Sequence, residues 1–208
     1  MDQLSLTAPN PDFVETATDT LKDAGYAVDY FPGEEVTVDF YRGLADREYD
    51  LVLLRAHSAR LQQEWQGQTL DQVILFTAEP YSEKKYIYEQ QLGQLAIARY
   101  FEDSEPLFGI APEFIRSSMT GSFDRSTVVL MGCEGLGSEE TARSFVGKGA
   151  KTVISWNGLV SAAHTDAATE DLIDLLVRQD LPPAEAVAET MADVGPDPTY
   201  GSELRLLE

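Results

Sequence analysis

The chain has 208 residues, enough for one sizeable hydrophobic core, and this length predicts a single domain over residues 1–208. Its 36 acidic and 15 basic side chains give a formal net charge of −21, which argues against nucleic acid and anionic membrane as partners because an acidic surface is repelled by both. A single cysteine excludes an internal disulfide and suits the reducing cytoplasm, and the sequence contains no signal-peptide pattern and no apolar run near the roughly 18 residues that span a bilayer.

The first half of the chain alternates a helical pattern with apolar runs. Residues 11–25 (PDFVETATDTLKDAG) follow Asn10, begin with proline, place apolar residues at helical spacing and end on a glycine, so they predict a helix. Residues 26–31 (YAVDYF) predict a strand. Residues 36–44 fit a short helix or an extended segment, because β-branched residues compete with their helical spacing. The continuous apolar run 49–56 (YDLVLLRA) predicts a strand buried on both faces.

The second half continues the same alternation. Residues 82–101 fit a helix, a hairpin or both. Three further strands are expected, over residues 72–77, 126–132 and 151–156. Four helices are expected, over residues 112–119, about 138–146, 165–179 with Thr165 or Asp166 as N-cap, and 182–191. Strands that alternate with helices predict one α/β domain with a mostly parallel sheet.

Two reactive side chains follow buried strands of this predicted sheet. His57 comes directly after run 49–56, and Cys133 comes directly after run 126–132. Ligands of open parallel sheets bind beyond the carboxyl ends of the strands, so the imidazole and the thiol face one another if these strands are neighbours. A thiolate is the attacking form of cysteine, and an imidazole can accept the thiol proton and later return one to a leaving group.

The turn after the cysteine supports this interpretation. Gly132 and Gly135 permit a tight bend, and the amides of that turn point toward developing negative charge. The backbone amide of Cys133 is therefore a candidate oxyanion donor, with the amide of Ser58 as the second. The competing interpretation of the cysteine is a small, inert core residue beside a turn.

Other chemistries fit the residues less well. A cysteine phosphatase needs arginine six positions after the cysteine, where this chain has Glu139. The loop has no lysine to bind phosphate, and the acidic side chains around it would repel that ligand. His57, Cys133 and His164 lie in separate segments without the short spacing of metal ligands, so neither a metal nor a cofactor is expected.

Five further residues have a functional and a structural interpretation. His164 precedes a predicted helix, and it either lines a substrate pocket or is a polar residue at the helix entry. Asp166 either caps that helix or recognises a basic substrate group. Trp156 and Asn157 end a strand at the active edge and either shape the pocket or belong to the core. Glu134 either orients its neighbours in the site or lies in solvent.

At these positions the sequence resembles the caspase-like cysteine peptidases, a superfamily that includes caspases, legumain, gingipain, clostripain, separase and the CHAT domains. The resemblance rests on a strand followed by histidine and on the later stretch VVLMGCEGLGSEETARSFVGKGAKTVISWNG, residues 128–158. It is nearest to the CHAT and gingipain-like branches, in which a cysteine turn precedes a helix and a GAxxVIxxW-like strand follows; here that strand is Gly149–Trp156. The resemblance covers about residues 25–191.

The resemblance implies a three-layer αβα caspase-like (caspase-hemoglobinase) fold, with histidine after the third strand and cysteine after the fourth. It implies that His57 is the general base and Cys133 the nucleophile of an endopeptidase that prefers a basic residue before the scissile bond (P1). The chain departs from the family at two places. Ser58 stands where a glycine is usual, and only MDQLSL is available for the first strand, so that strand is short or the chain is a fragment of a longer protein.

Three functions remain open from the sequence. The first is a cysteine endopeptidase acting on a polypeptide substrate. The second, which Ser58 and the sparse first strand favour, is a catalytically silent caspase-like module for regulation or protein interaction. The third is a thiol hydrolase or acyltransferase on a doubly wound sheet. The chain is acidic and has ten arginines and five lysines, a composition that resembles proteins adapted to high salt. The same composition also fits an acidic protein from a mesophilic organism. The oligomeric state is not predicted.

Overall fold

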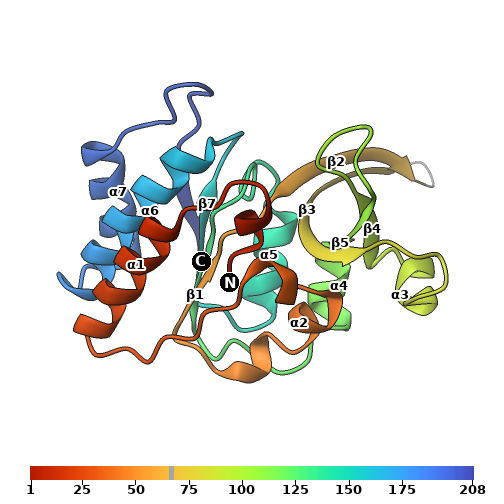
Figure 1. The fold of residues 1–208 in the computed structure, drawn as a ribbon, viewed down its shortest axis with the longest axis horizontal. Helices are drawn as coiled ribbons and strands as arrows, with labels where there is room; N and C mark the ends of the chain where they lie inside the picture. Colours follow the sequence, from red (N-terminus) through yellow and green to blue (C-terminus); the bar gives the residue numbers. More distant parts are fainter. Residues whose placement is uncertain (66–67) are drawn as a thin grey trace.

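The chain folds around two four-stranded sheets, and the first of them is mostly parallel (Figure 1). The structure, a computed structural model, describes residues 1–65 and 68–208. The strand order of the first sheet is β1–β6–β7–β8, with β1 (Leu51–Leu54), β6 (Thr127–Leu130), β7 (Thr152–Trp156) and β8 (Leu204–Leu207). The first three strands are parallel and β8 is antiparallel to β7. The apolar runs correctly predict β1, β6 and β7, whereas β8 lies in a tail that carries no strand pattern.

The N-terminal residues extend this sheet beyond β1 by a single bridge. Asp2 forms isolated parallel bridges with both Pro32 and Arg55, and the 3-10 helix η1 (Gln3–Leu6) begins at once. The predicted strand over residues 26–31 is wrong, since these residues have no regular structure and only Phe31 accepts a backbone bond there, from Asp2 (2.9 Å). A strand needs a hydrogen-bonded neighbour along its length, and the bridge at Asp2 is too short to supply one.

The second sheet was not expected from the sequence. Its strand order is β2–β3–β5–β4 and all its pairs are antiparallel. The strands are β2 (Ser58–Trp65), β3 (Gln68–Pro80), β4 (Leu95–Ala98) and β5 (Leu107–Ile110). Only part of β3 was predicted, because the strands on either side of it are polar or short. The chain passes from the first sheet into the second between Arg55 and Ser58, which places His57 at the junction.

Helices cover both faces of the first sheet, which gives a three-layer α/β arrangement (Figure 1). On one face lie α1 (Pro11–Asp23), α6 (Ala162–Val177) and α7 (Pro183–Asp193). On the other lie α2 (Val38–Arg42), α4 (Pro112–Ser117) and α5 (Glu139–Gly147). The short helix α3 (Ile87–Gln91) contacts β4. Over the described residues, no helix combines the length and apolar character needed to cross a bilayer.

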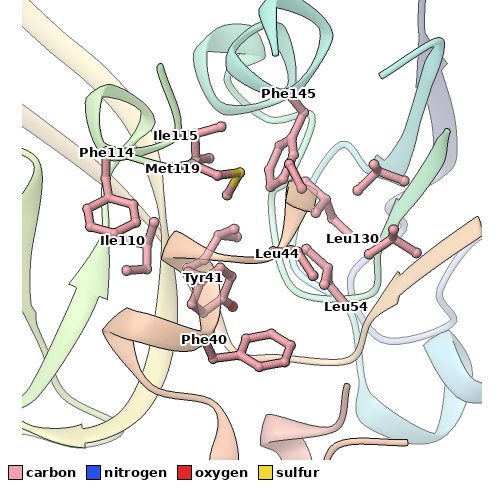
Figure 2. Close-up of a cluster of buried hydrophobic side chains, with 14 of the residues drawn as sticks. Phe40, Tyr41, Leu44, Leu54, Ile110, Phe114, Ile115, Met119, Leu130 and Phe145 are labelled. Atoms are coloured by element: carbon pink, nitrogen blue, oxygen red, sulfur yellow. The ribbon is translucent and has the colours of Figure 1, made fainter. Parts of the chain in front are cut away.

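The core follows the pleat of the parallel strands. In β6, Val128 and Leu130 face the layer of α2, α4 and α5, whereas Val129 faces α1 and α6. Figure 2 shows the first of these clusters, in which the aromatic and aliphatic side chains of α2, α4 and α5 meet Leu54 and Leu130 of the sheet. Since both faces of β6 are covered, its sequence is a continuous apolar run.

The helix boundaries follow local capping. The side chain of Asn10 accepts a hydrogen bond from Phe13 N–H (3.2 Å), so α1 begins where the sequence predicts. Helix α6 begins three residues earlier than predicted, and its N-cap is Ser161 rather than Thr165 or Asp166. The Ser161 N–H donates to Asp197 Oδ2 (2.9 Å), so a carboxylate distant in sequence supplies the cap.

A cavity of about 120 Å³ lies between α1, residues 26–31 and β1. Its walls are mostly apolar, with Phe13, Ala17 and Leu21 from α1 on one side. The hydroxyl of Tyr49 donates to Asp29 Oδ2 (2.7 Å) among the lining residues. The cavity occupies the space beside β1 where Asp2 is the only bridging residue, so the outer edge of β1 is incompletely covered.

Candidate active site

The carboxyl ends of β1 and β6 lie side by side. Leu54 is in register with Leu130, and the N–H of Met131 donates to Leu54 O (3.0 Å). Beyond the paired residues the two segments stay in contact, since the Ser58 hydroxyl, next to His57, donates to the carbonyl of Cys133 (2.6 Å). The segments that carry His57 and Cys133 are therefore neighbours at the end of the sheet.

Close contact between the two segments depends on Gly132. A Cβ at this position would overlap the carbonyl oxygen of Ala56 and the hydroxyl of Ser58. The Ser58 hydroxyl in turn donates to the carbonyl of Cys133 (2.6 Å). The Ser58 side chain thus binds the cysteine backbone and holds the two segments together.

The imidazole of His57 is held from several sides. Its Nε2 lies 2.7 Å from the hydroxyl of Thr7, and its backbone N–H donates to Gln3 Oε1 (3.0 Å). Its ring lies 5.0 Å from that of Tyr100 and 5.9 Å from that of Phe76, measured between centroids. In the part of the chain that the structure describes, Nδ1 has no hydrogen-bond partner, which leaves this nitrogen available to accept a proton.

The electrostatic surroundings keep His57 neutral. Burial lowers the pKa of the imidazole below its ordinary value of 6.5, and the positive charge of Arg55 lowers it further. A neutral imidazole at physiological pH is the form that a general base requires.

Cys133 is half-buried, and its thiol is protonated at neutral pH. Burial raises the pKa of the thiol, and the negative charges of Glu134 and Asp197 act in the same direction. The sulfur lies 3.6 Å from the carbonyl of Val160, within reach of a weak S–H hydrogen bond. No described hydrogen bond joins the sulfur to the imidazole, so proton transfer requires the thiol to rotate away from Val160. Such loose geometry is common before a substrate binds.

The two backbone amides that the sequence suggests as oxyanion donors have no acceptor among the described residues. Phe76 N–H donates to His57 O (2.9 Å), and Ser58 pairs with Leu75 in the next, non-hydrogen-bonded position of this antiparallel ladder. The N–H of Ser58 therefore points away from β3. Among residues 1–65 and 68–208, the N–H of Cys133 has no acceptor. Both amides named from the sequence are thus free to bind a ligand oxygen.

The tight turn after the cysteine is built differently from the sequence expectation. Its left-handed residue is Glu134 (φ 58°), whereas Gly132 and Gly135 have no positive φ. Gly135 is required for space, because a Cβ there would overlap the hydroxyl of Ser155. The N–H of Glu134 donates to Gly158 O (2.8 Å), so this amide is not available to a substrate. The Glu134 side chain is half-buried beside the thiol.

A buried ion network lies behind His57. The guanidinium of Arg55 makes two hydrogen bonds of 2.7 Å to the carboxylate of Asp166 and a third of 2.7 Å to Asp2. Asn10 Nδ2 also donates to Asp166 Oδ2 (2.9 Å). Asp166 is only 2% exposed, so it contacts these internal partners and has no free surface for a substrate. Asp166 therefore binds a basic side chain, as one interpretation of the sequence predicts. That side chain is Arg55 of the protein itself and not a group of the substrate.

The three remaining candidates support neighbouring backbone. Trp156 is 1% exposed, and its indole N–H donates to the hydroxyl of Thr165 (2.9 Å), so it belongs to the core. Asn157 Oδ1 accepts a bond from the N–H of Glu203 (2.8 Å) and so fixes the start of β8. His164 Nε2 lies 3.1 Å from the carbonyl of Gly195, and its ring packs on Trp156.

No pattern in the sequence marks the residues that hold the histidine. Thr7 and Gln3 come from the N-terminal segment, and Tyr100 comes from the loop after β4. Each of them is an isolated polar or aromatic residue in sequence, and only the packing of the second sheet against the N-terminal segment brings them to His57.

The described residues contain no cluster of three or more histidine, cysteine or acidic side chains arranged to hold a metal ion. No protein-family model matches this chain, and a search of curated proteins finds no similar sequence. The chemistry of the site is therefore argued from its geometry.

Proposed function

We propose that the protein is a caspase-like cysteine endopeptidase that works through a His57–Cys133 dyad. The observation that carries the proposal is the contact between the segments after β1 and β6, where the Ser58 hydroxyl, next to the neutral His57, donates to the Cys133 carbonyl. The free amides of Ser58 and Cys133 beside them support acyl-transfer chemistry in particular, because such chemistry develops negative charge on the carbonyl oxygen.

The order of the extended segments supports the caspase-like part of the proposal. Asp2 lies between Pro32 and Arg55, and β1, β6, β7 and β8 follow across the sheet. Counted along the chain within this sheet alone, the single bridge at Asp2 is first, the one at Pro32 second, β1 third and β6 fourth. His57 then follows the third and Cys133 the fourth, which is the order that the sequence resemblance implies.

The reaction would proceed by proton transfer and acyl transfer. His57 Nδ1 takes the thiol proton, and the sulfur of Cys133 attacks the substrate carbonyl carbon. The amides of Ser58 and Cys133 bind the carbonyl oxygen as it becomes negative. His57 then gives its proton to the leaving amine and the C–N bond breaks. Water, deprotonated by His57, hydrolyses the thioester and releases the second product as a carboxylic acid.

A basic residue at P1 is part of this proposal. The carboxylates of Glu134 and Asp197 both raise the pKa of the thiol through their negative charge, so the thiol lies in a negative field. The formal charge of the whole chain is −21, which adds long-range attraction for a cationic peptide. A positively charged substrate side chain would be stabilised beside Cys133.

The alternative is a catalytically silent caspase-like module. One observation favours it: the Cys133 sulfur contacts the carbonyl of Val160, and no described bond joins it to His57. In that case the same edge of the sheet would bind a polypeptide without cleaving it.

Covalent labelling separates the two functions. Wild-type protein would be titrated with peptidyl electrophiles that carry Arg, Lys or Asp at P1, beside Cys133→Ala and His57→Ala. We expect labelling of the wild type, fastest with Arg or Lys, no labelling of Cys133→Ala, and labelling of His57→Ala that is slower by about 10²-fold or more. Labelling at the same rate in His57→Ala would contradict the dyad. A folded wild type that neither reacts nor cleaves any peptide would support the silent module.

A further inference from the structure

Tyr100 packs against the imidazole of His57 and also keeps part of its ring surface open. Its ring centroid is 5.0 Å from that of His57 and 5.9 Å from that of Phe76. Phe76 is 5% exposed and lies beneath the other two rings as core, whereas Tyr100 is half-buried and keeps part of its surface open. An aromatic surface therefore continues from the imidazole to the exterior.

The hydroxyl of Tyr100 is held as a donor. Gln3 Oε1 accepts the N–H of His57, so the amide group of the same side chain faces the other way and donates to Tyr100 Oη (2.5 Å). Gln3 is fully buried, which fixes this arrangement. Tyr100 Oη thus accepts one bond, and in the described part of the chain its own proton has no acceptor. Burial also raises the pKa of Tyr100, so the phenol stays protonated.

The two halves of the site lie in different surroundings. Cys133 contacts the loop at Val160 before α6, whereas His57 contacts the second sheet and Tyr100. In the proposed reaction the cysteine keeps the acyl half of the substrate, and the histidine delivers a proton to the leaving amine. The leaving half must therefore pass the imidazole, and the surface that flanks the imidazole is that of Tyr100.

We infer that Tyr100 is a specificity-determining residue that contacts the leaving half of the substrate, where its ring packs on an apolar side chain and its hydroxyl donates to a main-chain carbonyl. The inference rests on the proposed function and deepens it, since it names an apolar residue directly after the scissile bond as the preferred substrate class. The turn over residues 101–104, directly after Tyr100, is held by Ser104. The Ser104 hydroxyl accepts from Phe101 N–H (3.2 Å) and donates to Phe101 O (2.9 Å).

Binding would be measured in the Cys133→Ala background, in which turnover cannot interfere. The probes are fluorescein-labelled peptides with Arg at P1 that differ only in the next residue, which is Leu, Phe, Gly or Asp. Tyr100→Ala removes the ring and Tyr100→Phe removes only the hydroxyl. The matched controls are Tyr88→Ala and Tyr88→Phe, because Tyr88 is 70% exposed on α3.

We expect the Leu and Phe peptides to bind about tenfold more tightly than the Gly peptide. Tyr100→Ala should reduce that preference to within twofold. Tyr100→Phe should keep the preference and weaken all four peptides by about two- to tenfold, the effect of one lost hydrogen bond. Both Tyr88 variants should behave as the parent protein.

A second measurement separates recognition from support of His57. In proteins that retain Cys133, the rate at which a small electrophile without a leaving-half residue labels Tyr100→Ala reports only the support of His57, and we expect it to fall by less than the binding of the Leu and Phe peptides. Equal losses for labelling and for every peptide would mean that Tyr100 only supports the imidazole, and would overturn the inference. Cleavage without any preference for the following residue would contradict the role of Tyr100 alone. A Tyr100-dependent preference without cleavage would contradict the peptidase proposal alone.

Discussion

The hydroxyl of Thr7 lies 2.7 Å from Nε2 of His57, although 50 residues separate them in the chain. If Nε2–H donates to this hydroxyl, Nδ1 is the unprotonated nitrogen and is free to accept the thiol proton. A single side chain of the N-terminal segment thereby holds the ring orientation of the proposed base.

Thr7→Val should weaken the base without removing it. The substitution keeps the shape of the side chain but loses the acceptor for Nε2–H, so we expect His57-dependent labelling of Cys133 to slow by about tenfold. Thr7→Ser restores the hydroxyl and should recover most of the rate. Thr16→Val, on the exposed face of α1, is the control and should leave the rate unchanged. Equal rates for Thr7→Val and wild type would contradict the positioning role.

The pH dependence of alkylation should report the raised pKa of Cys133, and that of peptidase activity the lowered pKa of His57. Because the pKa of Cys133 is raised above its ordinary value of 9.0, alkylation by an uncharged reagent should rise with pH and reach its midpoint above pH 9.0. Glu134→Gln removes one of the negative charges that raise this pKa, so its midpoint should fall. The lowered pKa of His57 should place the acid limb of any peptidase activity below pH 6.5. A thiol midpoint below 9.0 in the wild type would contradict the described environment.

Asp166→Asn should strongly destabilise the fold. It leaves the Arg55 guanidinium buried with only Asp2 as its anionic partner, and the loss of one partner of a buried ion pair costs about 3–5 kcal/mol of unfolding free energy. The control is Asp174→Asn, which breaks an exposed helical pair with Arg178 and should cost about 0.5 kcal/mol or less. Urea denaturation followed by circular dichroism gives both values, and a similar cost for the two variants would contradict the importance of the network.

Two glycine substitutions should act in opposite directions. Gly132→Ala places a Cβ against Ala56 O and Ser58 Oγ, so we expect a loss of about 1–3 kcal/mol and slower labelling of the adjacent cysteine. Gly147→Ala, at the end of α5, meets no atom within 4 Å and should stabilise the protein by up to about 1 kcal/mol. Thermal unfolding of the two variants beside wild type tests this, and an unaffected Gly132→Ala would show that the strand ends can separate.

The sequence predicts the part of the fold in which both faces of a strand are buried. The runs of β1, β6 and β7 are continuous and apolar, so their positions and the residues that follow them can be predicted directly. The antiparallel second sheet escapes prediction because its strands are stabilised by pairing with one another rather than by a pattern within each. Strand β8 pairs with β7 at the edge and is likewise not marked by its own sequence.

The candidate site, like the fold, has residues that the sequence predicts and residues that it does not. His57 and Cys133 can be predicted because each follows a recognisable strand and their side chains are chemically distinctive. Thr7 and Tyr100 cannot, since their contact with the imidazole depends on two segments folding over the strand end from opposite directions along the chain. For Asp166 the sequence predicts the wrong kind of role. Its position near a helix start suggests a cap or a substrate contact, whereas the buried guanidinium of Arg55 determines its role.

The pocket of about 120 Å³ beside α1 is open to solvent and borders the outer edge of β1. By contrast, β6 and β7 are covered on both faces. Amide hydrogens that face this outer edge should therefore exchange with solvent faster than those between β6 and β7. The strand that leads into His57 is then the one whose local opening costs the least free energy in the parallel part of the sheet.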